Sequence, residues 1–214
     1  YGSRINAKRF WVLDPVDGTK GFLRKMQYVT ALALVDAGEV VISVIGCPEL
    51  KLLSQVGGFT CAALGKGAYW QAFNDPREKV PLRVSSQRDL SSALLIRSFE
   101  DAHTNANQIE KFAQLAGIET EPVRMDSQAK YALLANGNAE ILLRLPSEDR
   151  PNYRENIWDQ APAYRLVLEA GGEMTDRFGR SLDFLTGKTM TKNIGVVATN
   201  GHLHQQTIDI LAQI

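Results

Sequence analysis

The chain has 214 residues, of which 44% are hydrophobic and 22% are charged, as is usual for a globular protein. Its 24 Lys and Arg residues balance 24 Asp and Glu residues, so the net charge gives no general affinity for nucleic acid or for an anionic membrane surface. The sequence holds no apolar run near the roughly 18 residues of a membrane span. It has only two cysteines, without zinc-site or disulfide spacing, which favours a reduced, cytoplasmic setting.

The first part of the chain predicts an antiparallel sheet, because short β-rich runs are separated by turn residues. A hairpin turn at residues 36–39 is expected to join two of these runs. The expected strands cover residues 10–13, 28–35, 40–45, 52–56, 59–63 and 68–71. The charged segment 73–80 indicates a boundary, so we expect one domain over residues 1–83 and a second over residues 84–214.

Strands alternate with helices in the second part, which indicates a layered α/β domain. The expected strands cover residues 93–97, 122–125, 141–145 and 195–198, and the expected helices cover residues 107–116, 127–136, 158–170 and 202–214. Asp126 or Ser127 is expected to cap the second of these helices, and the glycines at 171–172 to end the third. His202 and His204, near the last helix, are expected to be exposed.

The most informative stretch is W-V-L-D-P-V-D-G-T, residues 11–19. Asp14 and Asp17 flank a proline in a loop that should follow a strand, and the carbonyl of Val16 lies between them. Carboxylate and carbonyl oxygens are the ligands that Mg²⁺ prefers, and backbone amides after Gly18 can face an anion. The alternative is an ordinary turn, because D-P and D-G are common turn dipeptides.

A second stretch, I-W-D-Q-A-P-A-Y-R-L-V-L-E-A-G-G at residues 157–172, places Asp159 at the start of a helix. Taken alone, Asp159 is expected to be the N-cap of that helix. Pro162 fits the first helical turn, where its missing N–H costs little.

The two motifs together resemble the lithium-sensitive, metal-dependent phosphatase superfamily of inositol monophosphatase, and the resemblance covers essentially the whole chain. Within it, K-G-F-L-R after D-G-T resembles the 3′(2′),5′-bisphosphate nucleotidases, as do D-S-Q-A-K-Y at residues 126–131 and L-R-L-P at residues 143–146. The resemblance implies an α/β (α+β) fold with layers in the order α-β-α-β-α. This chain would supply the latter part of the first sheet and the whole second half, with the N-terminal helices and strands absent.

The resemblance also implies roles for particular residues. It implies metal ligands at Asp14, Val16, Asp17 and Asp159. It implies substrate contacts at Gly18, Thr19, His103, Ser127, Lys130 and Arg144. Thr19 and Asp17 would be catalytic, with Thr19 orienting the attacking water. For His103 the alternative is a surface histidine.

The implied reaction is metal-assisted hydrolysis with two or three Mg²⁺ ions. It would remove the 3′-phosphate from adenosine 3′,5′-bisphosphate and give AMP. The sulfated analogue, 3′-phosphoadenylyl sulfate, would be a second substrate and would connect the protein to sulfur assimilation. An inositol phosphate is the alternative substrate, although K-G-F-L-R argues against it.

Only thirteen residues precede Asp14, and none of them is acidic. The family that the chain resembles carries a longer N-terminal region, with a glutamate of the metal site and an acid that partners the threonine. We therefore expect a chain that lacks this region and leaves one face of its first sheet bare, so that the missing segment would pack on residues 1–83. The alternative to a nucleotidase is a non-catalytic remnant that still binds nucleotide or phosphate.

Overall fold

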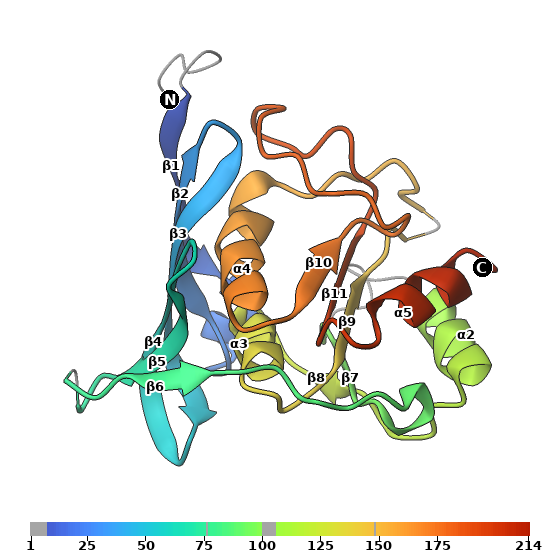
Figure 1. Ribbon diagram of the computed structural model, residues 1–214, viewed down its shortest axis with the longest axis horizontal. Coiled ribbons are helices and arrows are strands. Elements are labelled where there is room, and N and C mark those ends of the chain that lie inside the picture. Colours follow the sequence, from blue (N-terminus) through green and yellow to red (C-terminus); the bar gives the residue numbers. More distant parts are fainter. Residues whose placement is uncertain (1–7, 76, 100–105, 148) are drawn as a thin grey trace.

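The computed structural model describes residues 8–75, 77–99, 106–147 and 149–214. Within these residues, two sheets enclose a layer of helices, and two more helices cover the far side of the second sheet (Figure 1). The layers therefore follow one another as sheet, helix, sheet and helix. This arrangement confirms the layered α/β fold that the sequence predicts.

The first sheet is antiparallel throughout, with the strand order β1-β2-β3-β4-β5-β6. Its strands are β1 (Arg9–Asp17), β2 (Val29–Asp36), β3 (Glu39–Leu52), β4 (Gln55–Ala63), β5 (Gly67–Ala72) and β6 (Val80–Leu82). Every pairing joins strands that are consecutive in the chain, so the expected antiparallel N-terminal sheet is confirmed.

The second sheet has the strand order β10-β11-β9-β7-β8, and β7 runs parallel to both β8 and β9. Its strands are β7 (Leu95–Arg97), β8 (Val123–Arg124), β9 (Ile141–Arg144), β10 (Glu173–Thr175) and β11 (Val196–Thr199). The helices are α1 (Thr19–Leu23), α2 (Ala106–Ala116), α3 (Ala129–Ala135), α4 (Ile157–Glu169) and α5 (His204–Leu211), with a 3₁₀ turn at Leu90–Ser92. In the described part of the chain, no helix has both the length and the apolar character that crossing a membrane requires.

The hairpin of β2 and β3 forms where the sequence predicts it. The residues of β2 alternate between a buried and a more exposed face, as the period of two in a strand requires. The buried side chains are Val29, Ala31, Ala33 and Val35. Ala37 and Gly38 connect the strands, and both have positive φ, which suits a two-residue hairpin turn.

The strand expected at residues 52–56 is wrong. Leu53 and Ser54 have φ of 49° and 68° and form the turn between β3 and β4. Because Leu53 is apolar, the hydrophobic pattern of the sequence predicts a strand where the chain turns. Gly58 lies inside β4, and glycine is required there because a Cβ would come within 2.5 Å of the Trp70 ring.

The starts of α3 and α4 also differ from the prediction. The structure assigns Gln128, not Asp126 or Ser127, to the N-cap position of α3, and Ser127 precedes it with a φ of 62°. The hydroxyl of Ser127 nevertheless accepts a hydrogen bond from the amide of Ala129, the first residue of α3, at 3.3 Å. Helix α4 is preceded by Asn156 at the N-cap position. Asp159 therefore lies in the first turn of α4 and is not its N-cap.

Pro162 lies inside α4 rather than in its first turn. Because proline has no N–H, residue 162 cannot donate to the carbonyl of Trp158, four residues earlier. The side-chain amide of Gln128, at the start of α3, donates to that carbonyl at 3.1 Å. Gln128 thus replaces the missing helix hydrogen bond and joins α3 to α4.

One apolar cluster fills the space between the two sheets, and it includes residues of both sheets and of α3 and α4. Trp70 from the first sheet and Tyr131 from α3 are among its largest buried side chains. The expected boundary between residues 83 and 84 falls between β6 and β7. Residues from both sides of this boundary share the apolar cluster. The division into two domains stays a prediction.

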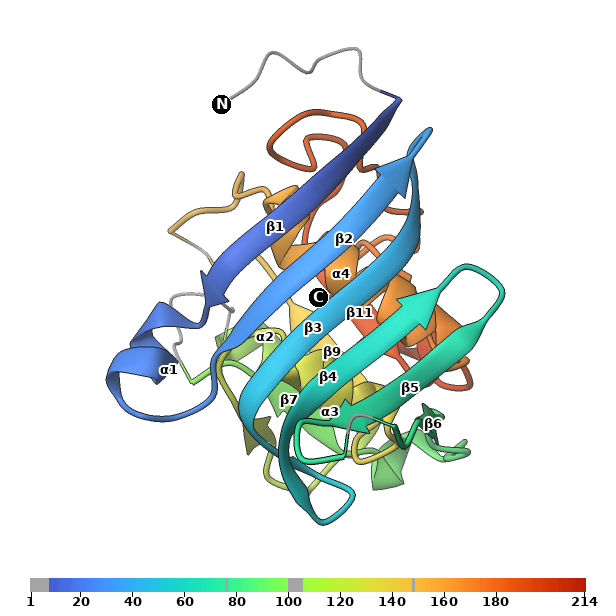
Figure 2. The same cartoon turned by 90° about the vertical axis from the view of Figure 1, so that its left-hand side faces the viewer.

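The opposite face of the first sheet, which is turned toward the viewer in Figure 2, carries exposed apolar side chains. Trp11 and Leu13 of β1 are 58% and 53% exposed, and their cross-strand partners on β2 are Leu34 and Leu32. Phe59 continues the apolar surface on β4. We call these five residues the outer face. No described helix covers it (Figure 2).

Candidate active site

A cavity of about 340 Å³ lies where the end of β1, the start of α3, the end of β9 and the start of α4 meet. It is lined by Asp14, Val16, Asp17, Gly18, Thr19, Lys20, Ser98, Asp126, Ser127, Lys130, Arg144, Tyr153, Asn156 and Asp159. These residues come from distant parts of the chain, so the cavity exists only because the two sheets pack around α3 and α4.

Three carboxylates in the cavity form an acidic cluster. Asp14, Asp17 and Asp159 each offer one oxygen, and these oxygens all lie within 4.8 Å of one another. Burial, and then the charge of Asp17, raise the pKa of Asp14. Burial raises the pKa of Asp159 to about 6, although the nearby Arg144 opposes the change. Such a cluster, with partly buried negative charges brought together, can hold a divalent metal ion.

An irregularity in β1 brings two of these carboxylates to one place. In a regular strand, residues three apart point to opposite faces, but the pairing of β1 with β2 shifts register between Asp14 and Asp17. The amide of Val16 donates to Oδ1 of Asp14 at 3.1 Å and fixes that carboxylate. The loop expected after residue 13 is therefore wrong, because these residues form the irregular end of β1.

Asp159 is held by the residue that precedes α4. Asn156 has an extended backbone at the N-cap position, but its side chain makes no hydrogen bond that caps the helix. Its Nδ2 donates instead to Oδ2 of Asp159 at 3.1 Å. The usual N-cap position thus supports the acidic cluster.

Gly18 allows the first motif to approach the segment before α3. It has a φ of 82°, and a Cβ at this position would lie 2.8 Å from the Cβ of Ser127. Only glycine fits such a conformation and such a close approach. The next residue, Thr19, donates its hydroxyl to the carbonyl of Val16 at 3.3 Å.

Two polar contacts join this first motif to the start of α3. The backbone amide of Gln128 donates to Oδ2 of Asp17 at 2.6 Å. Arg24 forms an ion pair of 2.7 Å with Asp126, whose side chain is 8% exposed. Arg24 is the last residue of K-G-F-L-R, so this stretch has a structural consequence, which is to anchor the acidic motif against the Ser127 segment.

The same cavity also contains two largely buried cations, Lys130 and Arg144. The ammonium of Lys130 donates to the carbonyls of Ser127 and Met125 at 2.8 and 3.2 Å, and burial lowers its pKa to about 8. Burial also opposes the charge of Arg144, but Glu155, at 2.8 Å, contributes to an overall raised pKa. Both side chains are therefore predominantly charged at neutral pH and can bind an anion.

Within the described residues, the structure brings together every site residue that the sequence predicts. Their roles stay predictions, and His103 lies outside the described residues. The expectation that His204 is exposed is wrong. Its Nε2 and Nδ1 lie 2.9 and 3.0 Å from the hydroxyls of Thr175 and Thr199, because α5 begins beside the ends of β10 and β11.

Five cavity residues have no role in the sequence-based prediction of the site, namely Lys20, Ser98, Asp126, Tyr153 and Asn156. Lys20 lies in K-G-F-L-R, and an asparagine three residues before Asp159 is a recognisable N-cap signal. Ser98 and Tyr153 carry no local signal, because only the tertiary fold brings the end of β7 and the segment before α4 to the cavity.

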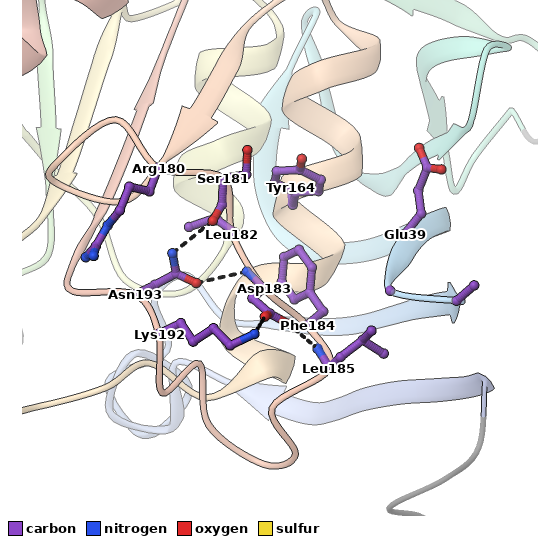
Figure 3. A pocket seen from close by; sticks show the side chains of 12 residues that line it. Glu39, Tyr164, Arg180, Ser181, Leu182, Asp183, Phe184, Leu185, Lys192 and Asn193 are labelled. Atoms are coloured by element: carbon purple, nitrogen blue, oxygen red, sulfur yellow. Dashed lines mark hydrogen bonds and ion pairs between the residues drawn. The ribbon is translucent and has the colours of Figure 1, made fainter.

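A second hollow, of about 710 Å³, lies between the β2–β3 turn and the segment 180–193 (Figure 3). Several of its polar groups bind one another. Lys192 pairs with Asp183 at 2.6 Å, and Asn193 binds the amide of Asp183. No acidic cluster lies there among the described residues, so the hollow does not resemble the cavity above.

The fold and the cavity define a class, a layered α/β protein with a carboxylate cluster that can hold a metal ion beside two buried cations. The chain belongs to the inositol monophosphatase family, whose family model matches residues 2–214.

Two related proteins match most of the chain. The chain is 42% identical over 207 residues to a 3′(2′),5′-bisphosphate nucleotidase of Oryza sativa, covering 91% of this chain and 56% of that protein. It is 38% identical to a 3′(2′),5′-bisphosphate nucleotidase of Schizosaccharomyces pombe, covering 96% and 60%. The chain thus spans somewhat more than half the length of these relatives.

Solved structures share the fold. An inositol monophosphatase from Anabaena matches with a TM-score of 0.74 and 24% identity, covering 99% of this chain and 75% of that one. CysQ from Bacteroides thetaiotaomicron matches with a TM-score of 0.70 and 21% identity, covering 92% and 71%. At such identities the likeness concerns the fold alone.

Proposed function

We propose that the full-length polypeptide containing this chain is a Mg²⁺-dependent phosphatase that removes the 3′-phosphate from adenosine 3′,5′-bisphosphate and gives AMP. The observation that carries the proposal is the joining of an acidic cluster and two buried cations in one cavity. A site that binds a phosphate ester together with a metal ion needs both kinds of group. Carboxylates hold the metal ion, and fixed cations balance the remaining negative charge of the phosphate. The nucleotide specificity rests on the relatives named above.

The residues present fit a divalent cation. Asp14, Asp17 and Asp159 converge, and burial raises the pKa of Asp14 and Asp159. The carbonyl of Val16, which lies between two of them in sequence, would be a further oxygen ligand. When bound, Mg²⁺ supplies the positive charge that stabilises a reacting phosphoryl group.

Thr19 is proposed to orient the attacking water. Its hydroxyl donates to the carbonyl of Val16, which leaves its lone pairs to accept a hydrogen bond from that water. Asp17 is fixed by the amide of Gln128, so its carboxylate has a defined position beside Thr19. The close approach of Gly18 to Ser127 would place backbone amides on both sides of the scissile phosphate.

The nucleotide is proposed to bind through Ser127, Lys130 and Arg144, which line the same cavity. Lys130 would act as a point charge and Arg144 as a planar double donor to a phosphate. Replacing Lys130 by alanine should mainly raise KM for the nucleotide, and an unchanged KM would remove it from the site. His103 stays a predicted contact to the adenosine.

The test is phosphate release from adenosine 3′,5′-bisphosphate by the full-length polypeptide with Mg²⁺. 3′-Phosphoadenylyl sulfate, inositol 1-phosphate and inositol 1,4-bisphosphate serve as competing substrates. A higher kcat/KM for an inositol phosphate would overturn the nucleotide proposal. Without turnover of any of them, binding of AMP would leave only the non-catalytic remnant.

A parallel measurement on the 214-residue polypeptide, with its intact mass verified, separates the contributions of the chain. We expect this polypeptide to bind AMP weakly and to release little phosphate, because it spans only 56% and 60% of the length of its two nucleotidase relatives. Turnover as fast as that of the full-length protein would contradict this expectation.

A further inference from the structure

Arg144 is held by a network of buried polar side chains. Its guanidinium donates to Oε2 of Glu155 at 2.8 Å, and the same oxygen accepts a hydrogen bond from Nε2 of Gln160 at 2.8 Å. Oε1 of Gln160 in turn accepts the hydroxyl of Tyr131 at 2.7 Å. The four residues come from β9, the segment before α4, α4 and α3, so the position of Arg144 is fixed from several elements at once.

This network contributes little net free energy to the stability of the fold. The Glu155 side chain is 6% exposed and that of Arg144 is 15% exposed. Removing two charges from water costs about as much as their attraction returns, and apolar side chains of similar volume often stabilise a protein equally well. The network therefore calls for a role other than stability.

The place of Arg144 in the cavity indicates what that role is. Its Nε is buried and has no hydrogen-bond partner among the described residues, while its side chain lines the cavity. Glu155 does not line the cavity. Glu155 thus holds one side of a guanidinium whose side chain lines the cavity.

We propose that Glu155 is a positioning residue, which holds the Arg144 guanidinium in the orientation that binds a phosphate group of the substrate. This inference rests on the proposed function, in which Arg144 binds that phosphate. Without Glu155, Arg144 would lose its fixed rotamer and would have to be ordered by each substrate molecule, which weakens binding. Gln160 and Tyr131 would maintain the orientation of Glu155.

The experiment uses the full-length polypeptide with the substitution Glu155→Gln, alone and together with Arg144→Ala. Steady-state kinetics with adenosine 3′,5′-bisphosphate are compared with calorimetric titrations of AMP and of inorganic phosphate. We expect Glu155→Gln alone to raise KM and the Kd for AMP about tenfold, the size usual for residues that orient a ligand-binding group, with little change in kcat. In the Arg144→Ala background the same substitution should change neither.

The matched control is Glu169→Gln at the other end of α4. Glu169 is also a largely buried carboxylate on an arginine, Arg165, at 3.1 Å, but it lies outside the cavity. This control should lower Tm without raising KM. If Glu155→Gln does not fold, Glu155→Asp replaces it, and it must raise KM more than Glu169→Asp does.

An unchanged KM in Glu155→Gln, or an equal increase with and without Arg144, would overturn the inference. Failure of the proposed function is a separate result. In that case the unsubstituted protein does not hydrolyse the nucleotide, yet Glu155→Gln still weakens the binding of AMP or phosphate through Arg144. If the unsubstituted protein binds neither of these ligands, the positioning role is overturned as well.

Discussion

Asp159 has opposite effects on the stability of the metal-free fold and on metal binding. Burial raises its pKa to about 6, which means that its ionised form is disfavoured in the folded protein without metal. The same ionised form is what a divalent cation requires. The negative charge of Asp159 therefore destabilises the metal-free protein and stabilises the metal-bound protein.

We predict that Asp159→Asn leaves the Tm of the metal-free protein unchanged or raises it. Added Mg²⁺ should raise the Tm of the unsubstituted protein but not of the variant, because only the former binds the ion well. Activity of the full-length polypeptide should fall more than tenfold, a loss of over ~1.4 kcal/mol in transition-state stabilisation. Asp14→Ala should lose activity to a similar extent.

The measurements are thermal unfolding with EDTA or Mg²⁺ and steady-state kinetics. Asp183→Asn is the control, because Asp183 pairs with the exposed Lys192 outside the cavity. It should keep both the Mg²⁺ effect and the activity. An Asp159→Asn protein that retains more than about a tenth of the rate would show that Asp159 is not a metal ligand.

His204 makes the second prediction at this scale. Burial lowers its pKa, and the charge of Glu173, at 3.8 Å, opposes the change. The unfolded chain, with a histidine pKa of about 6.5, therefore binds a proton more readily than the folded protein. The stabilising contribution of the neutral ring is fully present at pH values above this unfolded pKa of about 6.5. It is lost as the pH falls through the lowered pKa of the folded protein.

Urea unfolding across this pH range measures the effect. The free energy of unfolding should decrease on acidification, and His204→Gln should reduce the slope of that decrease. His202→Gln, at an exposed neighbouring position, should leave the slope unchanged. Equal slopes for His204→Gln and the unsubstituted protein would exclude His204 as the source.

The elements that the sequence predicts well are those whose local pattern agrees with their tertiary position. Strand β2 alternates regularly, and the turn after it contains a glycine at positive φ. Strand β10 and helix α1 are only three and five residues long and carry no periodic signal. The turn at Leu53 and Ser54 is hidden for a different reason, because neither residue type favours a left-handed backbone.

That turn carries the prediction at the scale of elements. Replacing Leu53 by asparagine and Ser54 by glycine should stabilise the protein by about 1 kcal/mol, because both positions have positive φ, which these residue types adopt at lower cost. Thermal and urea unfolding measure the change. Glycine at Gln55, the first residue of β4, is the control and should destabilise. A double variant less stable than the original would contradict the account of the turn.

The candidate site divides in the same way. The acidic residues and the two cations belong to short motifs, and the family resemblance of those motifs is what selects them. The network that holds Arg144 joins residues 11 and 29 positions apart, and no local pattern connects them. Only the tertiary structure brings Glu155, outside the cavity, into contact with Arg144 inside it.

At the scale of the whole molecule, no described helix covers the outer face of the first sheet (Figure 2). Trp11 and Leu13 are more than half exposed on it, and large apolar surfaces usually contact a partner. The chain spans only 56% and 60% of the length of the two relatives compared above. We propose that a segment of the full-length protein outside these 214 residues packs on the outer face.

The 214-residue polypeptide alone should therefore self-associate as its concentration rises, whereas the full-length protein should do so less. Replacing Trp11 by glutamine and Leu13 by lysine should reduce self-association of the short polypeptide. Sedimentation velocity over a concentration series measures both effects. A short polypeptide that stays monomeric throughout would show that the outer face needs no cover. Leu115→Lys, an exposed position on α2, is the control.

The hydrogen bond between Gln128 and Trp158 constrains the order in which this protein can change during evolution. While proline occupies position 162, loss of Gln128 leaves a helix carbonyl without its donor, and selection for stability would remove that variant. If position 162 first mutates to a residue with an N–H, the constraint on Gln128 from this contact is relieved. Descendants of this sequence can therefore lose the proline and then the glutamine more easily than the reverse. Comparison of diverging lineages could recover that order as a historical record.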